Sequence, residues 1–185
     1  MLMQETECMT GQNCEKNKDI YQEYHNIMVA YNGFFPRPVI SIANELGIDV
    51  KETDKLDSNL SGVIGKDDKG QFIILINKKL CSARKVFTIA HEIGHFILHQ
   101  NELNSGHEIV SGVKMSSCLP RENEPSEYKR RETDANKFAA ELLMPEKEFV
   151  ERCLKVDSIE EIANYFGVSV PAATIRANSL GWMFI

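Results

Sequence analysis

The segment His91-Glu92-Ile93-Gly94-His95 places two histidines four residues apart, with a glutamate directly after the first. Apolar residues flank it at helical spacing, so residues 82–100 are predicted to form a helix. In a helix, such histidines project from the same face, where two imidazoles can bind one metal ion. The glutamate beside them can accept a proton from a metal-bound water. The pattern therefore predicts His91 and His95 as metal ligands and Glu92 as a general base.

Gly94 lies in the interior of this predicted helix. A glycine there costs about 1 kcal/mol of helix stability relative to alanine. Its presence is accounted for if another backbone or a metal ion must approach the helix closely. We therefore expect such an approach at Gly94.

Composition limits the class of protein. The 185 residues carry a formal net charge of −6, and one domain of this size can bury a sizeable core. The acidic balance argues against non-specific binding of nucleic acid through a broad basic face. The five cysteines include no CxxC pair, which favours reduced thiols over a disulfide framework or a four-thiolate zinc site. No signal peptide and no apolar run of about 20 residues is evident, so we expect a cytoplasmic protein without a membrane span.

The remaining chain predicts the elements that position the motif. Residues 1–18 are polar and are predicted to be a flexible tail, and residues 19–185 a single domain. Strands are expected at residues 48–52, 60–64 and 72–77, the last two joined by a hairpin turn. Helices are expected at residues 19–31, 38–46, 126–144, 145–156, 159–166 and 171–179. The predicted fold is α+β, a compact helical domain with a small, mostly antiparallel three-stranded sheet packed on the motif helix.

Two further segments bear on function. Residues 101–126 are polar and contain glycines and prolines, which predicts a long loop or lid over the site. Residues 159–180 resemble a helix-turn-helix. Its second half offers only Arg176 and Asn178 for contacts with bases, so packing beside the active site is favoured over DNA binding.

A catalytic zinc site needs a third protein ligand and an open position for water. Asn101 occupies the position at which one class of such sites carries a third histidine. His99 shares a helix face with the motif histidines and is expected near the site but not as a ligand. His107, in the predicted loop, is a weaker alternative, and Cys81 lacks the Gly-Cys-Leu context of a cysteine ligand. A glutamate from a second helix is the other option.

The residues from Phe87 to His99, followed by those from Glu132 to Pro145, resemble the ImmA/IrrE family of zinc metallopeptidases. The resemblance extends over about residues 36–180. It implies a gluzincin-like site in which Glu132 is the third zinc ligand. Asn136, one helical turn later, would accept a hydrogen bond from a zinc-binding histidine. Asp134 is an alternative ligand.

The resemblance also implies a function. The protein would be a zinc-dependent endopeptidase acting on a helix-turn-helix repressor or regulator encoded nearby, as in mobile elements or stress responses. Candidates for stabilising the oxyanion are Arg84, His99, Tyr128 and Tyr165. The alternative is a non-proteolytic regulatory or toxin-like partner of a DNA-binding protein, with a structural or vestigial zinc site. Glu92 argues against it, because a structural site has no use for a glutamate between its histidines. No feature of the sequence predicts an oligomeric state.

Overall fold

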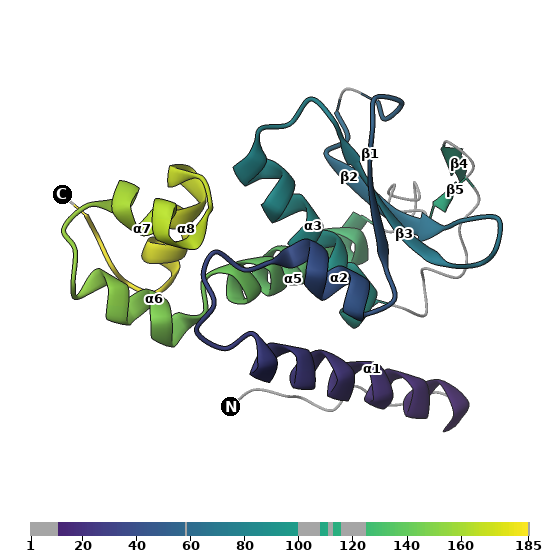
Figure 1. The fold of residues 1–185 in the computed structure, drawn as a ribbon, viewed down its shortest axis with the longest axis horizontal. Coiled ribbons are helices and arrows are strands. Elements are labelled where there is room, and N and C mark those ends of the chain that lie inside the picture. The colour runs from purple at the N-terminus through teal and green to yellow at the C-terminus, as the bar shows by residue number, and fades with distance from the viewer. Residues whose placement is uncertain (1–10, 58, 100–107, 111–112, 116–124, 185) are drawn as a thin grey trace.

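The computed structural model describes residues 11–57, 59–99, 108–110, 113–115 and 125–184 (Figure 1). In chain order the elements are α1 (Gly11–Ala30), α2 (Val39–Glu45), β1 (Asp49–Thr53), β2 (Gly62–Lys66), β3 (Phe72–Asn77), α3 (Ser82–Leu98), β4 (Glu108–Val110), β5 (Val113–Met115), α5 (Pro125–Leu143), α6 (Glu146–Cys153), α7 (Ile159–Phe166) and α8 (Val170–Ser179). The α+β class predicted from the sequence is confirmed. Helices α6–α8 lie at one end of the molecule and the sheet at the other (Figure 1).

The sheet has the strand order β1-β3-β2-β5-β4. Strand β3 is buried from Ile73 to Asn77, because it pairs with a strand on each side and packs on α3. The three predicted strands are present, and all pairs except the parallel β1–β3 pair are antiparallel. Strands β4 and β5 come from the segment predicted as a loop or lid, so the prediction is wrong for residues 108–110 and 113–115. The rest of that segment up to residue 124 lies outside the described residues.

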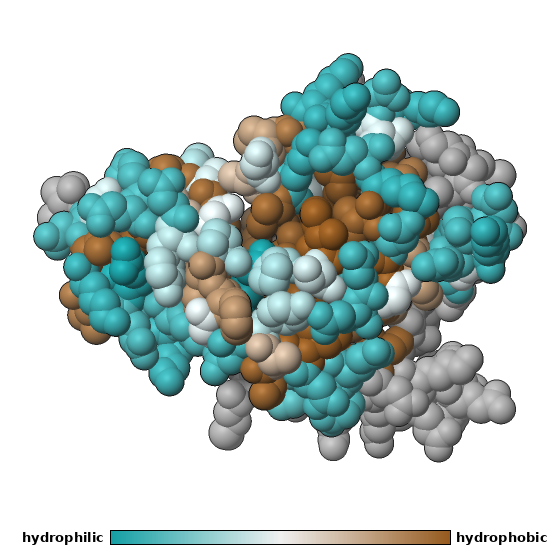
Figure 2. All heavy atoms as spheres, viewed as in Figure 1, coloured by the Kyte–Doolittle hydropathy of each residue, from teal (hydrophilic) through white to brown (hydrophobic). Residues whose placement is uncertain are grey.

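Helix α3 carries the motif and begins close to its predicted start. Its apolar face packs on the sheet, where the rings of Phe96 and Phe72 meet edge to face with centroids 4.9 Å apart. A Cβ built on Gly62 of β2 would lie 2.5 Å from the side chain of Thr88, so strand and helix are in very close contact there. Hydrophobic residues gather in the middle of one face of the molecule, where α2 and α3 meet the sheet (Figure 2).

Helix α5 lies against α3 at Gly94. A Cβ built on this glycine would be 3.2 Å from both Cα and the carbonyl oxygen of Ala135 and 3.1 Å from the ring of Phe138. The sequence analysis expected either a backbone or a metal ion close to Gly94, and the structure has the backbone of Ala135 there. Helix α1 packs on α3 and also contacts α5, where the rings of Tyr24 and Phe138 are 5.1 Å apart.

Helix α1 begins earlier than expected. Residues 11–18, predicted as part of a flexible tail, form its first turns. The prediction relied on apolar periodicity, which this polar stretch lacks. Its glutamine, glutamate and lysines favour helix by propensity alone.

The last three helices join the same hydrophobic core as the sheet and α3. Helix α7 begins with Ser158 as N-cap and ends at Gly167, whose φ is +68°. In α8, Arg176 donates from Nε to the carbonyl oxygen of Met144 (3.0 Å) and pairs with Glu141, which fixes α8 to the end of α5. In the described part of the chain, no helix combines the length and the apolar character needed to cross a membrane.

Candidate metal centre

Helices α3 and α5 run antiparallel and bring the candidate ligands together. Two pairs of side chains face each other across the two helices, His91 with Asn136 and His95 with Glu132. The close approach at Gly94, between the two histidines, lets a glutamate from α5 reach both imidazoles. The long sequence gap between the motif and Glu132 is thus closed by one helix–helix contact.

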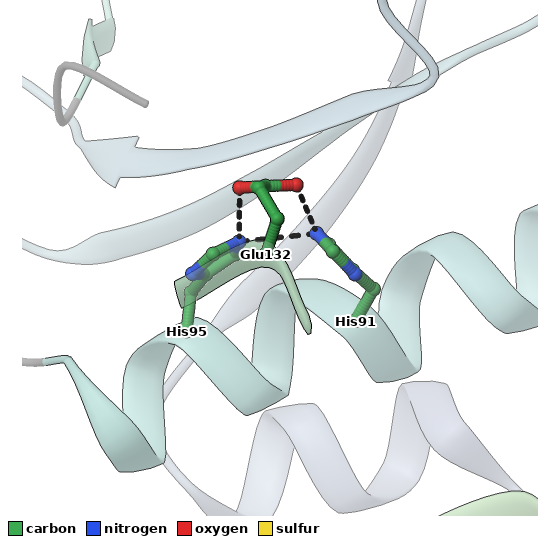
Figure 3. A group of neighbouring side chains, drawn as sticks. All are labelled: His91, His95 and Glu132. Carbon is green, nitrogen blue, oxygen red and sulfur yellow. Dashed lines mark hydrogen bonds and ion pairs between the residues drawn. The ribbon is translucent and has the colours of Figure 1, made fainter. Parts of the chain in front are cut away.

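The three side chains form a compact cluster in which the carboxylate of Glu132 lies opposite both imidazoles (Figure 3). Nε2 of His91 is 3.0 Å from Nε2 of His95. The two oxygens of Glu132 are 3.4 Å from Nε2 of His91 and 3.2 Å from Nε2 of His95. With metal–ligand bonds of about 2.0–2.1 Å, the edges of a coordination tetrahedron measure about 3.3–3.4 Å. The observed separations are close to such edges, so the two nitrogens and the carboxylate can converge on one metal ion.

The other nitrogen of each imidazole is also in contact. Nδ1 of His91 lies 3.0 Å from Oδ1 of Asn136, and Nδ1 of His95 lies 3.2 Å from Nδ1 of His99. An amide oxygen only accepts, so Nδ1 of His91 carries a hydrogen, and in the neutral ring Nε2 is then the nitrogen with a lone pair for a metal ion. The two Nε2 atoms lie 3.0 Å apart and face the carboxylate of Glu132, an arrangement that either a shared hydrogen or a cation can hold. The donor set therefore fits a bound metal ion.

The electrostatics of the cluster favour a charged carboxylate. Burial opposes the charged form of Glu132, but hydrogen bonds with His91 and His95 outweigh burial and lower the pKa of Glu132 to about 2. Burial likewise favours neutral His91, yet the hydrogen bond with Glu132 and the nearby carboxylates raise the pKa of His91 overall. Burial and the neighbouring His95 lower the pKa of His99 to about 4, which leaves this ring uncharged at neutral pH.

Glu92 is buried between α3 and the sheet, with 5% of its surface exposed. The backbone N–H of Ile64 in β2 donates a hydrogen bond to its carboxylate. The other oxygen, Oε2, has no hydrogen-bond partner among the described residues. Burial raises the pKa of Glu92, and the two neighbouring histidines only partly oppose this. A buried carboxyl group with one free oxygen is therefore held next to the candidate ligands.

A cavity of about 670 Å³ adjoins the cluster. It lies between the start of α3, the second half of α5, and α8. Asn136, which contacts His91, is part of its wall. The sequence analysis favoured packing of residues 159–180 beside the active site, and α8 forms one wall of this cavity. Sequence reasoning missed the N–H of Ile64, for which no side-chain signal exists.

The other predicted site residues fall into two groups. Arg84 lines the cavity and donates from Nη2 to Oγ of Ser61 (3.3 Å), and Tyr128 lies on α5 one turn before Glu132. Tyr165 is not brought to the cluster. Its ring packs between Phe35 and Phe166 and under the guanidinium of Arg152, because the aromatic residues of the α6–α8 end gather there.

Three alternative ligands can also be placed. Asp134 acts electrostatically on His99 and is not part of the three-residue cluster. Cys81 is exposed at the start of α3. His107 lies outside the described residues.

Comparisons with known proteins identify the family. The solved structure of a Mycobacterium tuberculosis transcriptional regulator superposes with a TM-score of 0.55 at 19% sequence identity. The match covers 89% of this chain and 48% of that protein, so the chain spans about half the length of its structural neighbour. Similarity at this identity shows a shared fold. No match was found among curated proteins. The model of the peptidase M78 family, described as the IrrE N-terminal-like domain, matches residues 43–178. Because that match covers well over half of the chain and confirms the resemblance in the motifs, the chain belongs to the peptidase M78 (IrrE N-terminal-like) family.

Proposed function

We propose that the protein is a zinc-dependent endopeptidase that hydrolyses a peptide bond in a protein substrate. The observation that carries the proposal is the buried Glu92, with one oxygen unpartnered among the described residues, beside a compact His-His-Glu cluster. Membership in a peptidase family supports the same reaction. In this proposal His91, His95 and Glu132 hold the metal ion.

The donor set favours zinc, because two imidazoles and one carboxylate are the ligands of many catalytic zinc sites. The cluster has three members, and no fourth His, Cys, Asp or Glu joins it among the described residues. One coordination position is thus left for water or substrate, as in a catalytic rather than a structural site. When bound, the ion supplies Lewis acidity for activating water and polarising a carbonyl group.

Side chains of the protein carry out the proton transfers and hold the ligands in place. Glu92 accepts a proton from the attacking water through Oε2 and transfers it to the leaving amine. Burial shifts the pKa of Glu92 upward, toward neutral pH, and a carboxyl group shifted in this direction can both accept a proton and return it. Asn136 and His99 hold the two imidazole rings in place through Nδ1. The antiparallel register puts Tyr128 at the level of His99, and Tyr128 and Arg84 are our candidates for stabilising the oxyanion.

For the substrate we propose a helix-turn-helix regulator encoded near the gene for this protein. The structural neighbour carries the description of a transcriptional regulator, which connects this fold with gene regulation. Direct DNA binding by α8 is not part of the proposal. Arg176, the one Lys or Arg of that helix, is already bonded to Met144 and Glu141 inside the fold.

The test compares Glu92→Gln with Glu151→Gln, which changes an exposed glutamate of α6 in the same way. Zinc per chain and cleavage of the neighbouring regulator are measured for both variants and the parent. We expect one zinc in all three proteins, with cleavage by the parent and Glu151→Gln only. Full cleavage by Glu92→Gln would contradict the general-base role. A zinc-loaded parent that binds the regulator without cutting it would support the non-proteolytic alternative.

A further inference from the structure

The cavity beside the metal centre is the strongest feature that the proposed function does not use. Asn136 lines it and lies 3.0 Å from the imidazole of His91, so the cavity starts next to the candidate metal ligands. Its volume of about 670 Å³ is within the range of sites that enclose a ligand of several side chains. Any peptide held at the metal ion therefore has this space beside its reacting bond.

The walls of the cavity are mostly apolar. Phe87 of α3, Ala140 of α5, Met144 directly after α5, and Ala172 and Ile175 of α8 contribute to them. Ile175 is 70% exposed, so its side chain is available to contact an apolar group of a ligand in the cavity. The alanines leave room where larger side chains would fill the space. The lining thus suits large apolar side chains.

The charged residues of the lining are all cations. Arg84, Lys137 and Arg176 contribute to it, and none of the described lining residues is acidic, although the whole chain has a net charge of −6. Arg176 is neutralised by Glu141. Among the described residues, the guanidinium of Arg84 bonds to the neutral Ser61 and neither Arg84 nor Lys137 forms an ion pair, so both keep a net positive charge at the cavity.

From this combination we propose that the cavity binds the part of the peptide substrate next to the scissile bond and selects a large apolar residue followed or preceded by an acidic one. The inference rests on the proposed function and adds the substrate class to it. The apolar walls bind the apolar side chain, and Lys137 and Arg84 attract the carboxylate.

The test measures binding separately from cleavage. Glu92→Gln is the background, because it holds a peptide without cutting it. Two fluorescent peptides are compared, one with the sequence Leu-Phe-Glu-Leu at its centre and one with lysine in place of glutamate. We expect the acidic peptide to bind about tenfold more tightly at low salt, and this preference to shrink as salt is raised.

Two substitutions assign the effect to the cavity. Lys137→Glu should abolish or reverse the preference for the acidic peptide, whereas Lys129→Glu, at an exposed position elsewhere on α5, should keep it. Ala172→Trp should fill the cavity and weaken binding of both peptides by about tenfold or more. Thr174→Trp, at an exposed position of α8 outside the lining, should not. Equal binding of the two peptides, or parental binding by Ala172→Trp with circular dichroism unchanged, would overturn the inference.

Cleavage sites in unfolded casein, mapped by mass spectrometry with the parent enzyme, separate this inference from the proposed function. Cuts beside Leu, Phe or Met with a nearby acid support both. Cuts without such a preference overturn the inference alone. Selective binding of the acidic peptide by a zinc-loaded enzyme that cuts nothing overturns the proposed function alone.

Discussion

Replacing Gly94 with alanine tests whether the spacing of α3 and α5 sets the metal site. The new Cβ would lie 3.1–3.2 Å from Ala135 and Phe138, and two of the three nearest atoms belong to the backbone of Ala135. Comfortable contacts between such atoms measure about 3.5–4.0 Å. A backbone cannot rotate away like a side chain, so the helices must separate locally by about 0.3–0.8 Å. Metal–ligand distances in proteins stay within about 0.2 Å of their usual values, so a larger shift of one ligand weakens the site.

The expected effects on stability and on metal binding differ. Alanine gains about 1 kcal/mol of helix propensity, and overpacking costs about 1–3 kcal/mol, so the free energy of unfolding of the metal-free protein should fall by no more than about 2 kcal/mol. Zinc affinity should fall much more, by about tenfold or beyond, because Glu132 moves away from both imidazoles.

The assay combines urea unfolding of the metal-free protein with competition for zinc against a chromophoric chelator. Asn164→Ala, at an exposed position in α7, is the control and should keep the parental zinc affinity. Parental zinc affinity in Gly94→Ala would refute the reasoning, because Glu132 would then reach the histidines without the close helix contact.

Three other substitutions test separate parts of the account. Asn136→Ala should weaken zinc binding by about 10–100-fold in the same competition assay, because one ligand imidazole loses its hydrogen-bond acceptor; unchanged affinity would count against that role. Glu132→Gln should lose zinc on dialysis, whereas Asp134→Asn should keep it. The opposite result would identify Asp134 as the third ligand. Gly167→Ala forces a Cβ to within 2.7 Å of a proline side chain at a φ of +68°, so urea unfolding should show a loss of about 2–4 kcal/mol. Gly70→Ala, with a similar φ but open space, should lose only about 1 kcal/mol, and equal losses would show that the proline contact is unimportant.

Some of the site could be predicted because its determinants are local. The common face of His91 and His95 follows from 3.6 residues per helical turn. Gly94 lowers helix stability, which indicated that a backbone or a metal ion comes close there. Glu132 could not be derived in that way. Its pairing with the histidines depends on how α5 packs across a long segment of chain, and only the resemblance to a family indicated it.

The features that the sequence predicted less well depend on packing. Tyr165 was one of four unranked candidates for stabilising the oxyanion, and its ring packs with Phe35 and Phe166. Strands β4 and β5 are only three residues each, too short for an alternating pattern to be visible among polar residues. The parallel pairing of β1 with β3 depends on tertiary contacts that strand propensity does not encode.

The most direct measurement of the central claim is the mass of the regulator after incubation with zinc-loaded protein in water enriched in ¹⁸O. The account predicts two fragments whose masses sum to that of the regulator plus one water, with one ¹⁸O in the new carboxyl group. Glu92→Gln should leave the regulator whole. An intact regulator in a stable complex with the zinc-loaded parent would contradict hydrolysis as the function of this site.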